Sequence, residues 1–148
     1  MAARAGRDIR HGVSATRGSP AITSTLSIEE VNAISGHFLG APALRDEPAL
    51  LAALARPITA AYRQQADLAM QAAVLIEGIA KAHAYVDANK RTAAAAGLVF
   101  MRLNGYQLHY VVDPLHDELG AQLVERVTRR VTVDAFAVWL RAHMVVIA

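Results

Sequence analysis

The chain has 148 residues, of which 54% are hydrophobic and 5% aromatic, and it contains no cysteine. Alanine alone accounts for 31 residues. Because alanine favours helices and adds little core volume, the composition fits one domain of closely packed helices. The absence of cysteine excludes disulfides and thiolate metal sites. No charge-free apolar stretch approaches the roughly 18 residues that a membrane span needs, so we expect a soluble protein of the cytoplasm that does not enter a membrane.

The formal net charge of +2 is concentrated near the N-terminus. Residues 1–28 carry four arginines and one aspartate, giving +3, whereas residues 29–148 carry eleven Lys or Arg and twelve Asp or Glu, giving −1. A general charge argument for nucleic acid therefore fails, and no direct binding to nucleic acid is expected of the protein alone. Residues 1–24 show no apolar period and are predicted to be a flexible extension, although an Arg-rich, acid-poor start is also typical of a transit peptide. Residues 25–148 are predicted to form the single folded domain.

The first predicted helix begins at a capping box, Ser27-Ile-Glu-Glu30, in which each of the two polar side chains accepts a hydrogen bond from the backbone of the other residue. Apolar residues recur at helical spacing as far as Phe38, and Gly40 is predicted to end the helix. Asp46 is predicted to cap a second, short helix that stops at Arg56-Pro57.

A long helix is predicted over about residues 67–84, followed by a loop at 85–89 and a further helix at about 90–103. Asn89 is predicted to be the N-cap of that helix, because its side chain is well suited to accept from the first free backbone N–H groups. Asn104-Gly105 supplies a left-handed stop at the other end.

The rest of the chain is predicted to hold a brief extended connection at 106–112 and two more helices, at about 114–128 and 134–145, the second capped by Thr132. There is no internal repeat and no strand pattern long enough for a sheet. The fold class is therefore predicted to be all-α.

The start of the predicted helix at 90–103 contradicts the usual charge preference of helices. Lys90 and Arg91 lie in its first turn, where the positive end of the helix dipole disfavours each cation by about 0.3–1 kcal/mol. Sequences accept such conflicts mainly at functional sites. A bound anion resolves it, because backbone N–H groups, an ammonium and a guanidinium then converge on one phosphate-sized charge.

Two further polar residues border the same loop. His83 ends the preceding helix, and a neutral imidazole there is suited to act as a general base. Asp87 follows four residues later, and a single carboxylate beside phosphates is a usual way to hold Mg²⁺. A base, a metal-binding carboxylate and a cationic phosphate site within nine residues predict phosphoryl or nucleotidyl transfer to a hydroxyl. Taken alone, His83 is better explained as a helix-end histidine with a structural role, and Asp87 can be a turn residue; it is their combination that favours the functional interpretation.

Residues 83–91 read His-Ala-Tyr-Val-Asp-Ala-Asn-Lys-Arg. This stretch resembles the signature of the Fic/Doc family, His-x-Phe-x-(Asp/Glu)-(Gly/Ala)-Asn-(Gly/Lys)-Arg, and in particular its Doc branch, the death-on-curing toxins. Two flanking blocks, Ala43-Leu-Arg-Asp46 through Pro57 and Leu98 through Tyr106, are similar to blocks of the same family in the same order. The resemblance implies a compact helical bundle with the active-site loop between two central helices.

The resemblance also implies a role for each residue of the signature. His83 would deprotonate the target hydroxyl, and Asp87 would hold Mg²⁺. The phosphates of ATP would be bound by an asparagine and two cations that come after Asp87, together with a lysine from the helix before the loop. Those phosphate-binding positions are Asn89, Lys90, Arg91 and Lys81. Tyr85 stands where the family usually has Phe, so its hydroxyl needs a hydrogen-bond partner or solvent.

Two positions bear on which phosphate is transferred. Fic enzymes that transfer AMP usually have Gly after the signature Asn and a second Arg three positions after the first, and this chain has Lys90 and Ala94 there. Doc proteins share these changes and transfer the γ-phosphate of ATP to a threonine of elongation factor Tu, which halts translation. The resemblance therefore favours a kinase-like toxin, with AMP transfer and a catalytically silent co-repressor as the alternatives.

The expected partner of such a toxin is an antitoxin of the prevent-host-death type. Many Fic proteins restrain themselves with a helix carrying (Ser/Thr)-x-x-x-Glu-(Gly/Asn). The nearest candidate here, Thr25 to Glu29, is followed by Glu30 instead of Gly or Asn. We therefore expect inhibition to come from a separate protein.

Overall fold

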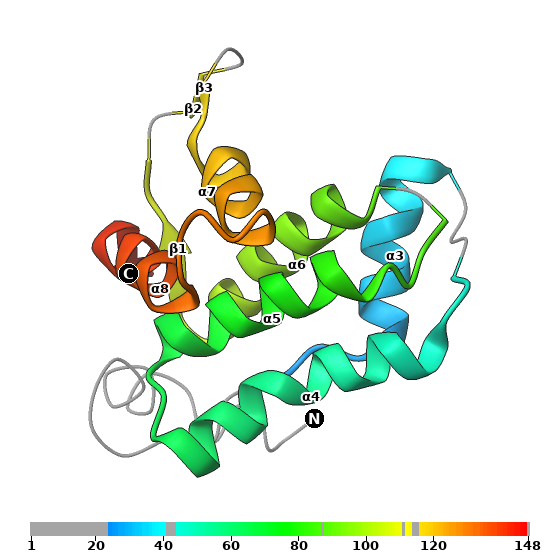
Figure 1. The fold of residues 1–148 in the computed structure, drawn as a ribbon, viewed down its shortest axis with the longest axis horizontal. Coiled ribbons are helices and arrows are strands. Elements are labelled where there is room, and N and C mark those ends of the chain that lie inside the picture. The colour runs from blue at the N-terminus through cyan, green and yellow to red at the C-terminus, as the bar shows by residue number, and fades with distance from the viewer. Residues whose placement is uncertain (1–23, 41–43, 87, 111, 114–115, 148) are drawn as a thin grey trace.

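A computed structural model describes residues 24–40, 44–86, 88–110, 112–113 and 116–147. Helices dominate these residues, as Figure 1 shows, in agreement with the predicted all-α class. The helices are α3 (Ile28–Leu39), α4 (Glu47–Gln64), α5 (Leu68–Ala82), α6 (Asn89–Leu103), α7 (Glu118–Val127) and α8 (Val133–His143). The strands are short: β1 (Tyr106–Leu108), β2 (Val112–Asp113), β3 (His116–Asp117) and β4 (Met144–Val146).

Side-chain caps begin four of these helices. The capping box predicted at Ser27 and Glu30 is confirmed, with both reciprocal hydrogen bonds present. The caps predicted at Asp46 and Thr132 are also confirmed, and Asp67 caps α5 by accepting from the backbone of Met70. Short polar side chains just before apolar periods are thus a dependable sign of helix starts in this sequence.

The predicted end of the second helix at Pro57 is wrong. Helix α4 continues through the proline to Gln64. Proline removes one backbone hydrogen bond, but Pro57 is buried, and the turn after it buries Ala60 and Ala61. This apolar packing favours continuation of the helix beyond the proline.

The C-terminal end of the chain also differs from the prediction. Helix α8 stops at His143, and residues 144–146 form β4, which pairs antiparallel with β1 in the register Tyr106–Val146. Strand pairing across that sequence distance satisfies the backbone of both segments and was not visible in any local alternation. Helix α7 begins at Glu118, four residues later than predicted, after the two-residue pair β2–β3.

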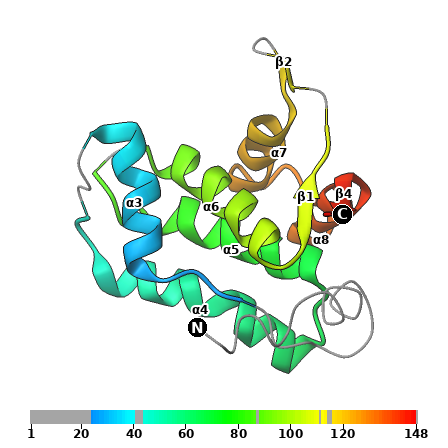
Figure 2. The same ribbon diagram turned by 180° about the vertical axis from the view of Figure 1, so that it is seen from behind.

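Helices α5 and α6 lie side by side at the centre of the molecule, and the remaining helices surround them (Figures 1 and 2). Helix α3 packs against α6, and α4 runs along α5, while α7 contacts both central helices and α8 packs against α5. The loop that joins α5 to α6 emerges at the end of the pair that lies next to α3, as both views show. The predicted placement of this loop between two central helices is confirmed.

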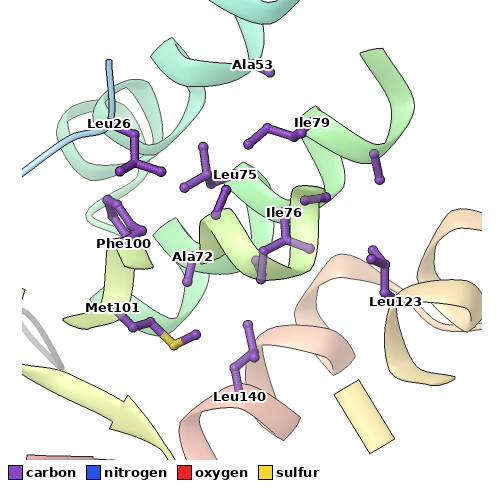
Figure 3. Packing of buried hydrophobic residues seen from close by; sticks show 14 of the residues in the cluster. Leu26, Ala53, Ala72, Leu75, Ile76, Ile79, Phe100, Met101, Leu123 and Leu140 are labelled. Atoms are coloured by element: carbon purple, nitrogen blue, oxygen red, sulfur yellow. The ribbon is translucent and has the colours of Figure 1, made fainter. Parts of the chain in front are cut away.

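The core is formed mostly by the inward faces of these helices. Figure 3 shows aliphatic side chains of α5 meeting Phe100 and Met101 of α6, with Leu123 of α7 and Leu140 of α8 closing the far side. Alanines fill the narrow gaps, and Ala72 and Ala73 of α5 are fully buried. The many alanines therefore allow the central helices to approach closely.

The approach is closest at Gly97 of α6. A Cβ atom at this position would lie 2.3 Å from Cδ1 and 2.4 Å from Cγ1 of Ile76 on α5. Ile76 is fully buried in the core between the two helices. Glycine at position 97 is thus required by packing.

Among the described residues, no helix is both long and apolar enough to cross a bilayer. The predicted extension, residues 1–24, lies outside the described residues except for Ser24. That residue is buried, and its backbone exchanges two hydrogen bonds with the side chain of Asn104, at 2.8 and 2.9 Å.

Candidate active site

The candidate site is the loop between α5 and α6, and it begins at His83. This residue is the C-cap of α5, and its backbone lies in the left-handed region at φ 49° and ψ 39°. For a residue other than glycine this conformation costs about 1–2 kcal/mol. Its side chain is exposed, so the imidazole is available to a substrate that binds at this loop.

The other end of the loop is the N-terminus of α6, which has no side-chain cap. Its N-cap is Ala88, also left-handed at φ 60°, and the first internal hydrogen bond runs from Thr92 N to Ala88 O, 2.9 Å. The first turn of any α-helix presents backbone N–H groups that have no acceptor within the helix. With no acidic residue in that turn, it favours binding of an anion.

Asn89 is not the N-cap, contrary to prediction. It is the first residue of α6, and its carboxamide makes two hydrogen bonds with Tyr85: it accepts from Tyr85 N at 3.1 Å and donates to Tyr85 O at 3.0 Å. The side chain thus replaces a pair of backbone hydrogen bonds across the loop. One amide hydrogen of Asn89 is not used by these two bonds.

Tyr85 anchors the middle of the loop in the core. The side chain is fully buried, and its hydroxyl donates to Asn32 Oδ1 of α3 at 2.7 Å. This supplies the partner that the replacement of the family's usual Phe required. Burial raises the pKa of Tyr85 to about 12, so the hydroxyl stays protonated and keeps donating at neutral pH.

The two cations of the α6 first turn, Lys90 and Arg91, are exposed. The Arg91 guanidinium lies over the ring of Phe38, 5.2 Å from its centroid. Such a cation–π contact contributes about 0.5–1 kcal/mol at an exposed site, and it holds the guanidinium beside the helix N-terminus. Lys90 makes no hydrogen bond or ion pair with another side chain in the described part of the chain, so its ammonium can turn toward a ligand.

Lys81 is engaged elsewhere. Its ammonium lies 3.6 Å from Glu77, one turn earlier on α5, and Glu77 also binds Arg56 of α4 at 2.9 Å and Arg126 of α7. Burial acts to raise the pKa of Glu77, but hydrogen bonds from the two arginines outweigh it and hold the pKa below its usual value. This ion-pair cluster joins α4, α5 and α7, and Lys81 stands at its edge with a side chain that is 31% exposed.

The predicted metal ligand, Asp87, lies outside the described residues. The described residues contain no cluster of three or more side chains suited to hold a metal. The expected donor set is different, however, because Mg²⁺ bound with nucleotides takes one or two protein carboxylates and completes its shell with phosphates and waters. A single carboxylate directly before the N-cap Ala88 fits that donor set.

Three residues that shape the loop were not identified as site residues from the sequence. Arg45 donates from Nη2 to the backbone carbonyl of His83 at 3.0 Å, Asn32 receives the Tyr85 hydroxyl, and Phe38 supports Arg91. All three lie far from the loop in sequence, in or just after α3. Two signals were present: Arg45 lies in the flanking block that resembles the family, with no role attached to it, and the Tyr85 hydroxyl at an apolar position required a partner.

Comparison with known proteins places this geometry in a family. The model of the family described as Fic/DOC matches residues 23–101, a range that includes α3 to α5, the loop and most of α6. A curated protein named Toxin Doc, from Mycolicibacterium smegmatis, is 39% identical over 121 residues, which cover 78% of this chain and 90% of that protein. The chain belongs to the Fic/Doc family.

Proposed function

We propose that this protein is the toxin of a toxin–antitoxin pair and that it transfers the γ-phosphate of ATP to a threonine hydroxyl of a translation factor such as elongation factor Tu. The observation that carries the proposal is the uncapped N-terminus of α6 with Lys90 and Arg91 in its first turn. Support comes also from the family and from the name of the Mycolicibacterium relative. The substrate factor is a cytoplasmic protein, which makes the cytoplasm the proposed site of action.

The proposed reaction has one proton transfer and one phosphoryl transfer. His83 removes the proton of the target hydroxyl, the hydroxyl oxygen forms a bond to the γ-phosphorus, and the bond to the bridging oxygen of ADP breaks. Arg91, Lys90 and the first-turn N–H groups of α6 stabilise the negative charge of the phosphates. Asn89 contributes its remaining amide hydrogen, and Lys81, at the edge of the Glu77 cluster, adds longer-range positive charge.

Mg²⁺ would be held by Asp87 and the phosphates, where it would neutralise charge and orient the nucleotide. Within the protein, Arg45 and Asn89 hold the backbone of the loop, and Phe38 supports the Arg91 guanidinium.

Transfer of AMP is the alternative reaction of this family. Two observations favour transfer of the γ-phosphate. Position 94, where AMP-transferring relatives are expected to carry a second arginine, is a half-buried alanine that packs against the core, and a bulky cation, Lys90, follows Asn89. Without a cation at position 94, the α-phosphate has less support for attack.

Labelled ATP distinguishes these reactions. The purified protein is incubated with elongation factor Tu and ATP labelled at either the γ- or the α-phosphate. We expect label on the factor from the γ-position only, and label from the α-position only would establish AMP transfer instead. His83→Ala is expected to reduce transfer by about 10²–10⁴-fold, the usual contribution of a general base.

Growth tests the third possibility, a catalytically silent co-repressor. Expression of the wild type is expected to arrest growth, and His83→Ala is expected to relieve the arrest. Equal inhibition by both proteins would rule out the enzymatic account. The proposed inhibitor is a small antitoxin of the prevent-host-death type, whose C-terminal segment folds as a helix on the toxin; co-expression of such a protein should restore growth.

A further inference from the structure

The backbone at His83 needs external support. Among the described residues of the loop, His83 and Ala88 are the two non-glycine residues with positive φ. A left-handed residue of this kind persists only where the surrounding structure fixes it. The orientation of the peptide group after His83 sets the direction in which the imidazole leaves the backbone. This is because the planar peptide and the side chain are both attached to the Cα atom of His83, so a rotation of one relative to the rest of the chain reorients the other.

That support comes from the segment just before α4. Three donors of residues 45 and 46 reach two consecutive carbonyls of the loop: Arg45 Nη2 to His83 O at 3.0 Å, Arg45 N to Ala84 O at 2.6 Å, and Asp46 N to Ala84 O at 3.1 Å. An isolated antiparallel bridge between Leu44 and Tyr85 extends the same contact by one residue. The left-handed turn is thereby held from outside the helix that it ends.

One of the three donors is a side chain, and this side chain is exposed. Arg45 has no ion-pair partner among the described residues, so its guanidinium is not held in place by a carboxylate. A guanidinium is well suited to this contact, since it is planar and always charged and makes stronger hydrogen bonds to carbonyls than a neutral donor does. Burial and core packing do not explain why an arginine is directed at this carbonyl.

We propose that Arg45 is a positioning residue for His83: its guanidinium fixes the His83 carbonyl, and thereby the direction of the imidazole toward the target hydroxyl. The catalytic part of this inference rests on the proposed function of His83 as the base. Arg45 acts on the proton-transfer step and leaves the binding of ATP to the α6 N-terminus largely unchanged.

The kinetic test compares Arg45→Gln and Arg45→Lys with the wild type. Glutamine is too short to reach the carbonyl, whereas lysine keeps both the charge and one reaching donor. We expect kcat to fall by about 10- to 100-fold in Arg45→Gln, since a small misplacement of a catalytic group has an effect of this size. KM for ATP should change by less than about threefold, and Arg45→Lys should recover part of kcat.

Arg63→Gln is the matched control, because Arg63 is an exposed arginine in the last turn of α4, at the opposite end of that helix. It should leave kcat unchanged. A rise in KM for ATP with unchanged kcat in Arg45→Gln would overturn the proposal and make Arg45 a phosphate contact. The proposal would also be overturned if both Arg45 variants lost kcat to the same extent and lost thermal stability in parallel. In that case the role of Arg45 would be in folding alone.

A second measurement does not depend on activity. The N–H groups of Asp46 and Tyr85 are hydrogen-bonded to Ala84 O and Asn89 Oδ1. Their hydrogen exchange, followed by NMR, should accelerate by about tenfold in Arg45→Gln, since a charge-assisted hydrogen bond that fixes this turn is lost, while exchange in the buried turn at Ile76 should stay the same. Unchanged exchange at Asp46 and Tyr85 would overturn the proposal whatever the kinetics show. If the exchange accelerates while the wild type transfers no phosphate or AMP, the positioning contact is established, and it is the proposed function that fails.

Discussion

Helices α3 and α6 pack against each other, yet their first turns carry opposite chemistry. Helix α3 begins with a complete capping box: Ser27 Oγ accepts from Glu30 N at 3.1 Å, and the Glu30 carboxylate accepts from Ser27 N at 2.9 Å. Helix α6 begins at a left-handed Ala88 with no side-chain cap and with two cations in the first turn. At the start of α3, the capping box supplies hydrogen-bond acceptors within the protein. The first-turn N–H groups of α6 have no side-chain cap, so α6 is stabilised more than α3 by a bound anion.

The difference shows what each helix contributes. A polar cap contributes about 1 kcal/mol to stability, and α3 has this contribution without any ligand. Helix α6 lacks it and also accepts the dipole cost of Lys90 and Arg91, about 0.3–1 kcal/mol each. Burial of its inner face, including Phe100 and Met101, offsets both. Helix α3 therefore supports the candidate site, while the first turn of α6 is part of it.

Reversing one charge at the start of α6 would test this comparison most strongly. Lys90→Glu should weaken ATP binding by about 10- to 100-fold, since a charged hydrogen bond to phosphate contributes about 1.5–3 kcal/mol. The same change should raise the free energy of unfolding by about 0.5–2 kcal/mol, because an unfavourable charge is removed and a favourable one is added. Calorimetric titration with ATP and thermal melts would measure the two effects.

Arg102→Glu is the control for that substitution, because Arg102 is exposed in the last turn of the same helix. A negative charge there meets the negative end of the dipole, so stability should fall slightly while ATP binding stays unchanged. If Lys90→Glu destabilised the protein as Arg102→Glu does, the contrast between α3 and α6 would not hold.

The converse change removes the cap of α3. Ser27→Ala should lower the free energy of unfolding by about 1 kcal/mol, which corresponds to about 3 °C in the melting temperature of a chain of this size. Phosphate transfer, measured well below the melting temperature, should remain at the wild-type rate. A large loss of activity in the folded variant would mean that the first turn of α3 belongs to the site.

A smaller effect is expected at the contact between α3 and the loop. Tyr85→Phe removes the hydrogen bond to Asn32, and because Asn32 is only half-buried, the loss at neutral pH should stay below about 1 kcal/mol. Burial raises the pKa of Tyr85 to about 12 in the folded protein from 10.0. Its contribution is therefore complete below pH 10 and is lost as the pH rises from about 10 to about 12.

Denaturant unfolding at pH 9 and pH 11 measures this effect. The wild type should lose more stability between these values than Tyr85→Phe does. Tyr62→Phe, at a tyrosine that is 60% exposed on α4, should keep the wild-type decline. Identical slopes for the wild type and Tyr85→Phe would contradict the role of the buried hydroxyl.

Local signals in the sequence predicted much of the fold. The caps at Ser27, Asp46 and Thr132, and the left-handed glycines at 40 and 105, are visible within four residues and are present. The errors arose where distant packing decides. Helix α4 passes Pro57 because the turns beyond it pack against α5, and β4 forms because its backbone pairs with β1, almost 40 positions earlier in the chain.

The candidate site followed a similar pattern. The conflict between the helix dipole and Lys90 pointed to the first turn of α6, which the structure shows without a side-chain cap, and the family signature pointed to the loop before it. The side chains that brace this loop, Arg45 and Asn32, were not predicted, because their partners lie 38 and 53 residues away. Asn89 was wrongly predicted to be the N-cap for a related reason. Its carboxamide makes two hydrogen bonds with the backbone of Tyr85, and sequence spacing does not show whether an asparagine will bond to that backbone or to the first turn of its own helix.

The contact between Gly97 and Ile76 sets the alignment of the two helices that flank the site. Because the Ile76 side chain occupies the space where a Cβ of residue 97 would lie, α6 cannot slide along α5 or turn about its own axis without a collision. Ile76 lies two turns before His83, and Gly97 lies about two turns after Lys90. The contact between Ile76 and Gly97 therefore fixes the register of α6 along α5, and with it the spacing between the imidazole and the first turn of α6. Anyone redesigning the protein for a longer or shorter acceptor would have to begin at positions 76 and 97, well inside the core, before altering the loop.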